Sequence, residues 1–244
     1  MDKFNQKPQN KSNIRDTLKI SIIIPTLNEE KAIGKVLREI PKKALKREHE
    51  LEILLIDGAS TDNTKAIAEN LGATVITEKR KGYGRAYKAG FKHATGDIIV
   101  TADGDYTYSM SIIPSLIEKL EKENLDFITT NRFRYMDKKS MTTLHKIGNQ
   151  TLTIATQLLF HTNIKDSQSG MWIFRKNILR QLNLESDSMS FSEEIKIEAY
   201  KRGFRCREIP IRYRMRIGEV KLKSFKDGIK NLGFLIQKKI KKIT

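Results

Sequence analysis

The sequence predicts an α/β fold in which helices cover a mainly parallel, Rossmann-like sheet. Short apolar runs alternate with amphipathic segments as far as residue 130, and this alternation is typical of a doubly wound sheet. Polar and acidic residues stand directly after several of these runs, at the strand ends where such sheets bind ligands. The chain has 244 residues, 39% of them hydrophobic and 31% charged, which suffices for one domain with a sizeable core.

The predicted elements follow one another along the chain. Short apolar runs predict strands at residues 18–25, 52–56, 74–77, 97–102, 127–130 and 206–213, with a loop and strand at 165–174. Amphipathic segments predict helices at residues 28–40, 61–70, 85–94, 112–123, 142–160 and 191–201. Acids in the first turn favour the start of the first helix, and Pro41 ends it. Thr61 or Asp62 caps the second helix, which Gly72 closes.

Positive charge is concentrated near the C-terminus. The net charge is +17, and residues 201–244 contribute +12 of it, with 15 Lys and Arg against 3 Asp and Glu. Such a segment attracts phosphate-bearing partners, whether nucleic acid, anionic lipid or a phosphorylated substrate. The sequence contains no nucleic-acid-binding motif, and its first 200 residues carry only +5. Both facts argue against a nucleic-acid partner.

Acidic residues follow three of the predicted strands. Asn28 and Glu29 follow the first, Asp57 ends the second, and Asp103-Gly104-Asp105 comes directly after the fourth. Because parallel strands end at the same edge of a sheet, we expect these side chains to lie close together. Carboxylates are hard oxygen ligands that suit Mg²⁺ or Mn²⁺, usually together with substrate phosphates. Taken alone, the Asp-Gly-Asp segment also fits an ordinary acidic turn.

Four motifs stand in a fixed order in the first half of the chain. They are Pro25-Thr26-Leu27-Asn28-Glu29, Asp57-Gly58-Ala59-Ser60-Thr61-Asp62, Gly82-Tyr83-Gly84-Arg85-Ala86 and Asp103-Gly104-Asp105. In this order they resemble the family 2 glycosyltransferases. The resemblance implies a glycosyltransferase A-type fold, a nucleotide diphosphate sugar as donor, and Mg²⁺ or Mn²⁺ bound by Asp103 and Asp105. The implied nucleotide-binding residues are Pro25, Thr26, Asn28, Glu29, Asp57, Lys81 and Asp103.

Further motifs follow the acid pair. They are Asn131-Arg132, His145 to Asn149, Asp166-Ser167-Gln168-Ser169-Gly170-Met171 and Arg216-Ile217-Gly218-Glu219-Val220-Lys221-Leu222. Over residues 18–228 the chain thereby resembles the dolichol-phosphate mannose and glucose synthases. This implies inverting transfer of a hexose from GDP-mannose or a UDP-hexose to dolichyl or polyprenyl phosphate. The implied acceptor-phosphate residues are Arg132, Asn149, Ser169, Arg216 and Lys221. The implied catalytic residues are Asp105, Arg132, Arg216 and Lys221.

Three positions depart from the motifs of these synthases. They are Gly58-Ala59, where the usual second acid after Asp57 is missing, Thr107 and Val220, so the nucleotide and the sugar stay open.

The proposed reaction needs cations more than it needs a base. A divalent metal neutralises the charge that develops on the leaving diphosphate. A phosphate monoester is largely dianionic at neutral pH, because its second pKa is about 6, so it is already a nucleophile. Arg132, Arg216 and Lys221 would position it.

Two other enzyme classes stay open. A family 2 transferase acting on a glycan or soluble hydroxyl would need a carboxylate base, for which Glu194 is the candidate. A nucleotidyltransferase is the other alternative, but residues 25–29 are not the Gly-rich phosphate loop that such enzymes usually carry.

Residues 222–244 predict a basic amphipathic helix. Its apolar residues share one face: Leu222, Phe225, Ile229, Leu232, Leu235, Ile236 and Ile240. Lysines occupy the remaining positions, a pattern typical of helices at anionic membrane surfaces. A helix packed on the core with its lysines facing water is the alternative.

The domain organisation follows from these segments. We expect a flexible N-terminal arm over residues 1–17, a catalytic domain over 18–221 and the amphipathic helix after it. No apolar run approaches the ~18 residues that a transmembrane helix requires. The expected location is therefore cytoplasmic and peripheral, on the inner face of a membrane. The oligomeric state stays open.

Overall fold

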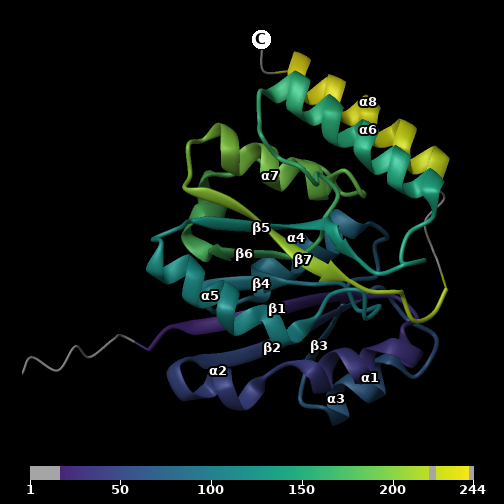
Figure 1. Cartoon of the computed structure of the whole chain (residues 1–244). Coiled ribbons are helices and arrows are strands. Elements are labelled where there is room, and N and C mark those ends of the chain that lie inside the picture. The colour runs from purple at the N-terminus through teal and green to yellow at the C-terminus, as the bar shows by residue number, and fades with distance from the viewer. Residues whose placement is uncertain (1–16, 220–223, 242–244) are drawn as a thin grey trace, which may run out of the picture.

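The computed structural model describes residues 17–219 and 224–241, except for the side chains of 224–226. The predicted arm, up to residue 16, and the predicted site residue Lys221 lie outside the described residues. Within them a seven-stranded sheet has the order β3-β2-β1-β4-β6-β5-β7 (Figure 1). The strands are β1 (Lys19–Thr26), β2 (Glu50–Asp57), β3 (Thr74–Thr77), β4 (Ile98–Thr101), β5 (Phe127–Met136), β6 (Trp172–Arg175) and β7 (Cys206–Tyr213).

One strand of this sheet, β6, runs against the others. β1 pairs in parallel with β2 and β4, β2 with β3, and β5 with β7. β6 pairs antiparallel with both β4 and β5. The predicted α/β fold with a mainly parallel sheet is therefore confirmed. The reversal of β6 was not predicted, because an apolar run reveals that a strand exists but not its direction.

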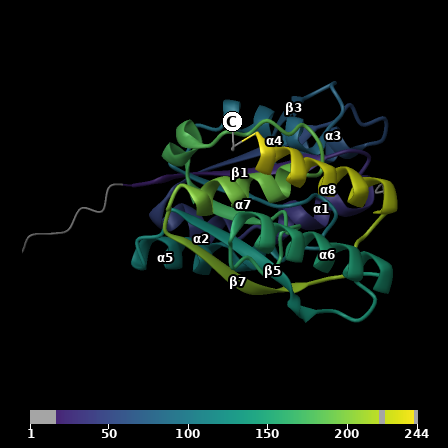
Figure 2. The ribbon, with the colours of Figure 1, turned by 90° about the horizontal axis from the view of Figure 1, so that it is seen from above.

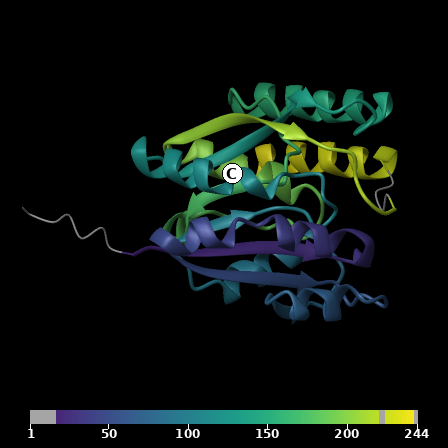
Figure 3. The same ribbon diagram turned by 60° about the horizontal axis from the view of Figure 1, so that its bottom comes forward.

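Helices cover both faces of the sheet (Figures 1 and 3). They are α1 (Glu30–Glu39), α2 (Lys42–Glu48), α3 (Thr64–Asn70), α4 (Tyr83–His93), α5 (Ile113–Lys122), α6 (Thr143–Phe160), α7 (Phe191–Lys201) and α8 (Ser224–Ile240). Short 3₁₀ turns span Met110–Ile112 and Lys176–Gln181. The sequence prediction missed α2. Pro41 does end α1, but a new helix begins directly after it, because the fixed φ of proline suits the first residues of a helix.

The strand β1 lies in the centre of the core. Ile20, Ile22 and Ile24 pack into one hydrophobic cluster, whereas Ile23 packs into a second cluster on the opposite face. Side chains alternate between the faces of a strand, so a strand that is buried on both faces needs a continuous apolar run. This explains why the first apolar run in the sequence was the easiest strand to predict.

The helices α6 and α8 lie side by side, with α7 between them and the sheet (Figures 1 and 2). Leu235 fixes α8 in place because it is fully buried in a cluster with α6 and α7. Lys238 is also largely buried, and its ammonium pairs with Glu194 at 2.8 Å and Glu198 at 3.2 Å. The predicted single apolar face of this helix is therefore divided between the core and the exterior. The alternative that its lysines face water is wrong for Lys238.

The helix α7 buries four charged residues, namely Glu193, Glu194, Lys196 and Glu198. The last three have hydrogen-bond or ion-pair partners. Neither carboxylate oxygen of Glu193 makes a hydrogen bond of normal geometry among the described residues. Burial raises the pKa of Glu193 to about 8, although nearby Gln168 and Asn231 oppose the rise. Burial therefore favours the protonated form of Glu193, against the opposing charge of Lys196.

The variant Glu193→Gln is expected to stabilise the protein increasingly as the pH rises. An ordinary Glu has a pKa of 4.5 and folded Glu193 one of about 8, so between these values folding takes up a proton. The wild type therefore loses stability as the pH rises through this range and levels off above it. Glutamine has nearly the same size and never ionises. The difference in Tm between variant and wild type should thus be small near pH 5 and grow to about pH 8.

The surface substitution Glu118→Gln serves as control, because the carboxylate of Glu118 is exposed and pairs with Lys122. Its effect on Tm should not grow between pH 5 and pH 8. A pH-independent difference for Glu193→Gln as well would show that Glu193 ionises like a surface residue.

Candidate active site

The carboxyl ends of β1, β2 and β4 meet at one edge of the sheet, as predicted. Thr26 ends β1 in register with Asp57 at the end of β2, and Asp103 follows β4 on the other side of β1. The loop after each of these strands contains a non-glycine residue in the left-handed backbone region: Asn28 (φ 49°), Ala59 (φ 63°) and Tyr106 (φ 71°). Such conformations cost free energy and cluster at functional sites. Backbone strain therefore points to this edge independently of the acids.

The side chain of Asp57 is fully buried and only half satisfied. Its Oδ2 accepts a hydrogen bond from the Ser60 backbone N–H at 3.0 Å. Its Oδ1 and the hydroxyl of Thr26 have no partner among the described residues. A buried acceptor without a donor is costly, so this corner fits a ligand that brings N–H groups, such as a nucleotide base.

The other predicted nucleotide residues have different surroundings. Asn28 ties the first two loops together, since its side chain accepts a hydrogen bond from the Thr61 backbone N–H at 2.8 Å. Pro25 lies within β1, and Lys81 is exposed in the loop before α4.

Asp103 and Asp105 are two carboxylates close enough to repel each other electrostatically. Burial and the negative charge of Asp105 raise the pKa of Asp103 to about 7. Tyr83, which the sequence prediction missed as a site residue, donates its hydroxyl to Oδ1 of Asp103 at 3.2 Å. Two hard oxygen ligands that repel each other fit a divalent cation. Within the described residues no group of three or more His, Cys, Asp or Glu converges, so donor phosphates and water would complete its coordination.

Asp105 is held in place from two directions. Its Oδ1 accepts hydrogen bonds from the backbone N–H of Thr107 at 3.1 Å and from the Thr107 hydroxyl at 2.6 Å. Its Oδ2 pairs with the Arg216 guanidinium at 3.2 Å, and Arg216 also pairs with Glu29. Arg216 therefore joins the predicted nucleotide wall to the predicted metal ligand, a link that the sequence could not show.

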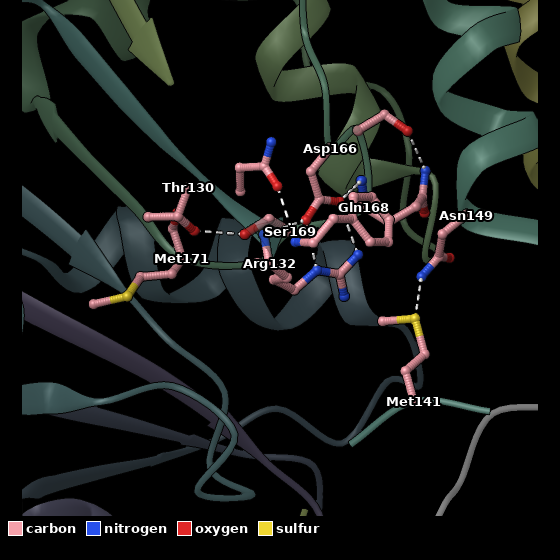
Figure 4. Close-up of polar contacts among 12 residues, drawn as sticks. Thr130, Arg132, Met141, Asn149, Asp166, Gln168, Ser169 and Met171 are labelled. Carbon is pink, nitrogen blue, oxygen red and sulfur yellow. Dashed lines mark hydrogen bonds and ion pairs between the residues drawn. The ribbon is translucent and has the colours of Figure 1, made fainter. Parts of the chain in front are cut away.

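Arg132 lies on β5 and is buried against Asp166 (Figure 4). Its Nε and one terminal nitrogen donate to the two carboxylate oxygens of Asp166, each at 2.8 Å. Burial raises the pKa of Asp166, but the opposite charge of Arg132 outweighs it and keeps that pKa below its ordinary value. Arg132 and Asp166 therefore form a buried ion pair and not a surface one.

Ser169 lies close to Arg132, whereas Asn149 points elsewhere. The hydroxyl of Ser169 is buried and lies 2.6 Å from that of Thr130. The side-chain amide of Asn149 on α6 extends toward the sulfur of Met141 at 3.5 Å (Figure 4). The structure thus brings Arg132 and Ser169 together but does not bring Asn149 into hydrogen bonding with them.

Glu194, the candidate base for a hydroxyl acceptor, is fully buried. Its carboxylate accepts hydrogen bonds from the backbone N–H groups of Glu185 at 3.0 Å and Ser186 at 2.8 Å, and it pairs with Lys238. Both carboxylate oxygens of Glu194 are therefore occupied by partners within the protein. Glu194 is a structural acid that braces the loop before α7.

A mainly parallel sheet with an acid pair after β4 and a buried carboxylate at the end of β2, on the other side of β1, has the architecture of the A-type glycosyltransferase fold. The chain belongs to glycosyl transferase family 2, whose sequence profile matches residues 21–182. It is therefore a glycosyltransferase.

Several curated proteins are similar to this chain. The low-salt glycan biosynthesis hexosyltransferase Agl6 of Haloferax volcanii is 33% identical over 92% of this chain. The chain spans only 54% of the length of Agl6. A dolichyl-phosphate hexose transferase of the same organism is 32% identical, over 86% of this chain and 89% of that protein. The dodecaprenyl-phosphate galacturonate synthase of Rhizobium johnstonii is 27% identical, over 72% of this chain and 53% of its own length.

Among solved structures, glucosyl-3-phosphoglycerate synthase from Mycobacterium tuberculosis has the same fold. Its complex with Mn²⁺, UDP and glucosyl-3-phosphoglycerate superposes with a TM-score of 0.68 at 20% identity, covering 91% of this chain and 77% of that one. In the part of this chain that the structure describes, no helix is both long and apolar enough to cross a bilayer.

Proposed function

We propose that this protein transfers a hexose, with inversion, from a nucleotide diphosphate sugar to a polyprenyl phosphate, assisted by Mg²⁺ or Mn²⁺. The observation that carries this proposal is the placement of arginine charge beside the acid pair. Arg216 contacts Asp105, and both Arg132 and Arg216 lie near enough to Asp103 to oppose the rise of its pKa. A dianionic acceptor needs such cations and no general base.

The residues divide into a donor side and an acceptor side. Asp57 would accept N–H groups of the base through its unpaired Oδ1, and Asp103 and Asp105 would hold the metal. When bound, the metal supplies positive charge against the leaving diphosphate. Arg132 and Arg216 would orient the acceptor phosphate on the opposite face of the sugar. A phosphate oxygen then bonds to the anomeric carbon while the bond to the diphosphate breaks and its electrons leave with the nucleotide.

The names of two relatives support this acceptor class. The dolichyl-phosphate hexose transferase and the dodecaprenyl-phosphate galacturonate synthase are both named for polyprenyl phosphates. The Mn²⁺ and UDP complex of the structural neighbour supports a divalent metal and a nucleotide donor.

A donor and acceptor panel tests the proposal. The purified protein is incubated with GDP- and UDP-hexoses, a short polyprenyl phosphate, and Mg²⁺ or Mn²⁺, and lipid-linked hexose is measured. The non-phosphorylated polyprenol and a soluble sugar alcohol are the matched acceptors. Transfer to the phosphate alone is expected. Transfer only to the hydroxyl acceptors would favour the alternative family 2 activity.

We further propose that α6 and α8 together form the surface that docks on an anionic membrane. Large apolar side chains stand exposed along one stripe of each helix: Leu144, Ile147, Ile154 and Leu158 on α6, and Ile229, Leu232, Ile236 and Ile240 on α8. The spacing within each stripe is helical, and the two helices are neighbours (Figure 1). Exposed lysines at 230 and 241 accompany the apolar side chains. Apolar stripes with adjacent cations suit a membrane interface.

Replacing an apolar residue of this surface by an acid is expected to weaken membrane binding without unfolding the protein. Leu158 is 71% exposed, so Leu158→Glu should leave Tm nearly unchanged. Flotation with vesicles containing anionic phospholipid should show a clear loss of bound protein. Point substitutions are preferable to removing residues 229–244, since that deletion would also remove the buried Leu235 and the partner of Glu194.

Tyr135→Glu is the matched control. Tyr135 is 53% exposed and belongs to β5, not to either helix, so this variant should float like the wild type. Equal flotation of Leu158→Glu and the wild type would contradict docking through α6.

A further inference from the structure

Residues 165–170, called here the acceptor loop, connect α6 to β6 and carry Asp166 and Ser169. Side chains from three other elements hold its backbone. Glu208 of β7 accepts the N–H groups of Lys165 and Asp166 at 3.0 and 2.9 Å. The hydroxyl of Thr153 on α6 accepts the N–H of Ser167 at 3.1 Å. The loop is therefore fixed by specific bonds and not by apolar packing alone.

The third set of hydrogen bonds to the loop backbone comes from Lys196 on α7, a fully buried lysine. Its ammonium donates to the backbone carbonyl of Asp166 at 2.7 Å and to that of Ser167 at 2.9 Å. Burying a charge is costly, and burial lowers the pKa of Lys196 to about 7 while Asp166 opposes the shift. An apolar side chain would avoid this cost but would leave two carbonyl groups unbonded.

Asp166 connects Lys196 to the arginine of the site. The carboxylate of Asp166 accepts hydrogen bonds from the backbone N–H and the guanidinium of Arg132 at 2.8–2.9 Å. Its carbonyl is held by Lys196 and its N–H by Glu208. Every polar group of Asp166 is thus engaged, so a shift of its backbone would carry the Arg132 guanidinium with it.

We propose that Lys196 is a positioning residue for the acceptor phosphate. By fixing the carbonyls of Asp166 and Ser167, it sets the position of the acceptor loop and so of Arg132 and Ser169. This inference rests on the proposed function, in which Arg132 and Ser169 bind the acceptor phosphate. Lys196 itself touches neither substrate. The donor residues Asp57, Asp103 and Asp105 belong to other loops. Gly170 packs against Asp103, but it lies at the end of the acceptor loop away from the two carbonyls that Lys196 holds. Loosening the loop at residues 166 and 167 should therefore spare the nucleotide.

The test compares Lys196→Met with Lys201→Met in the full chain. Methionine keeps an unbranched side chain of similar length but donates no hydrogen bond. Lys201 lies on the same helix, with its ammonium over the ring of Phe160. Initial rates are measured at varied short-chain polyprenyl phosphate, and nucleotide binding by calorimetry with Mn²⁺.

For Lys196→Met the KM for the acceptor should rise about 10- to 100-fold, because displacing a positioning group by about 1 Å can cost that much. Nucleotide affinity should stay as in the wild type, and Lys201→Met should leave both quantities unchanged. A normal acceptor KM in a folded Lys196→Met protein would overturn the inference. So would equal losses for acceptor and nucleotide, which indicate a purely structural role. A wild type that does not glycosylate polyprenyl phosphate would instead overturn the proposed function.

Hydrogen exchange on the wild type keeps the inference testable should Lys196→Met not fold. Saturating polyprenyl phosphate should slow exchange of the amides of the acceptor loop, because binding to Arg132 and Ser169 would stabilise the contacts that hold it. Unchanged exchange across residues 165–170, with exchange slowed elsewhere at the site, would separate the loop from the acceptor and overturn the inference.

Discussion

Asp105→Asn is expected to lower the transfer rate about 100- to 1,000-fold and to abolish the metal dependence of nucleotide binding. Asparagine keeps an oxygen for the two bonds from Thr107 but loses the charge that would face the metal. Removing that charge also relieves the repulsion that raises the pKa of Asp103. It breaks the ion pair with Arg216, but Arg216 keeps its second carboxylate partner, Glu29. The ligand-free Tm should therefore move by no more than about 4 °C, equivalent to ~1 kcal/mol.

Thermal melts with and without Mn²⁺ plus nucleotide measure this effect. The wild type should gain stability from the ligand by mass action, and Asp105→Asn should lose that gain. Asp97→Asn is the matched control, since Asp97 accepts the Lys19 N–H next to the opposite end of β4. It should keep both activity and the ligand-induced shift. If Asp105→Asn also keeps the shift, the metal assignment is wrong.

Arg132→Met is expected to destabilise the protein by about 3–5 kcal/mol, because it leaves the buried carboxylate of Asp166 without its main counter-charge. For a domain of this size the corresponding fall in Tm is about 6–20 °C. Arg205→Met is the matched control. Arg205 also makes a bidentate ion pair, with the two carboxylate oxygens of Asp126 at 3.1 and 3.0 Å, but half of its side chain is exposed. Its loss should cost less than about 1 kcal/mol.

The double variant Arg132→Met with Asp166→Asn separates stability from catalysis. Asparagine removes the unpaired charge and keeps one side-chain oxygen, which can accept the backbone N–H of residue 132 or that of residue 168, because these bond to different oxygens of Asp166. Much of the lost stability should return, since the penalty comes from an uncompensated charge. Transfer to polyprenyl phosphate should not return, because the acceptor would still lack its guanidinium. Restored transfer in the double variant would mean that Arg132 is purely structural.

The sequence was most informative where a pattern is local. Neighbouring residues predicted the continuous apolar run of β1 and the ends of α1 and α3 at Pro41 and Gly72. They also predicted the bounds of α7 and β7. The sequence prediction failed for two elements. It missed α2, which begins directly after a proline, and it missed the antiparallel direction of β6 between two strands that are parallel to each other. Its placement of Asp57, Asp103 and Asp105 at one edge was confirmed, because parallel strands must end together.

By itself the sequence determined the α/β fold, the family and the acids at the strand ends, since each depends on short motifs in a fixed order. Only the tertiary structure decided which charges meet. Arg216 and Asp105 are far apart in the chain but share an ion pair, and Arg132 is enclosed by Asp166 from the loop before β6. The same holds for Lys196, whose buried ammonium donates to two backbone carbonyls of the loop before β6. A buried charge is stable only beside partners that the fold brings to it, and these partners cannot be predicted from the neighbouring residues in the sequence.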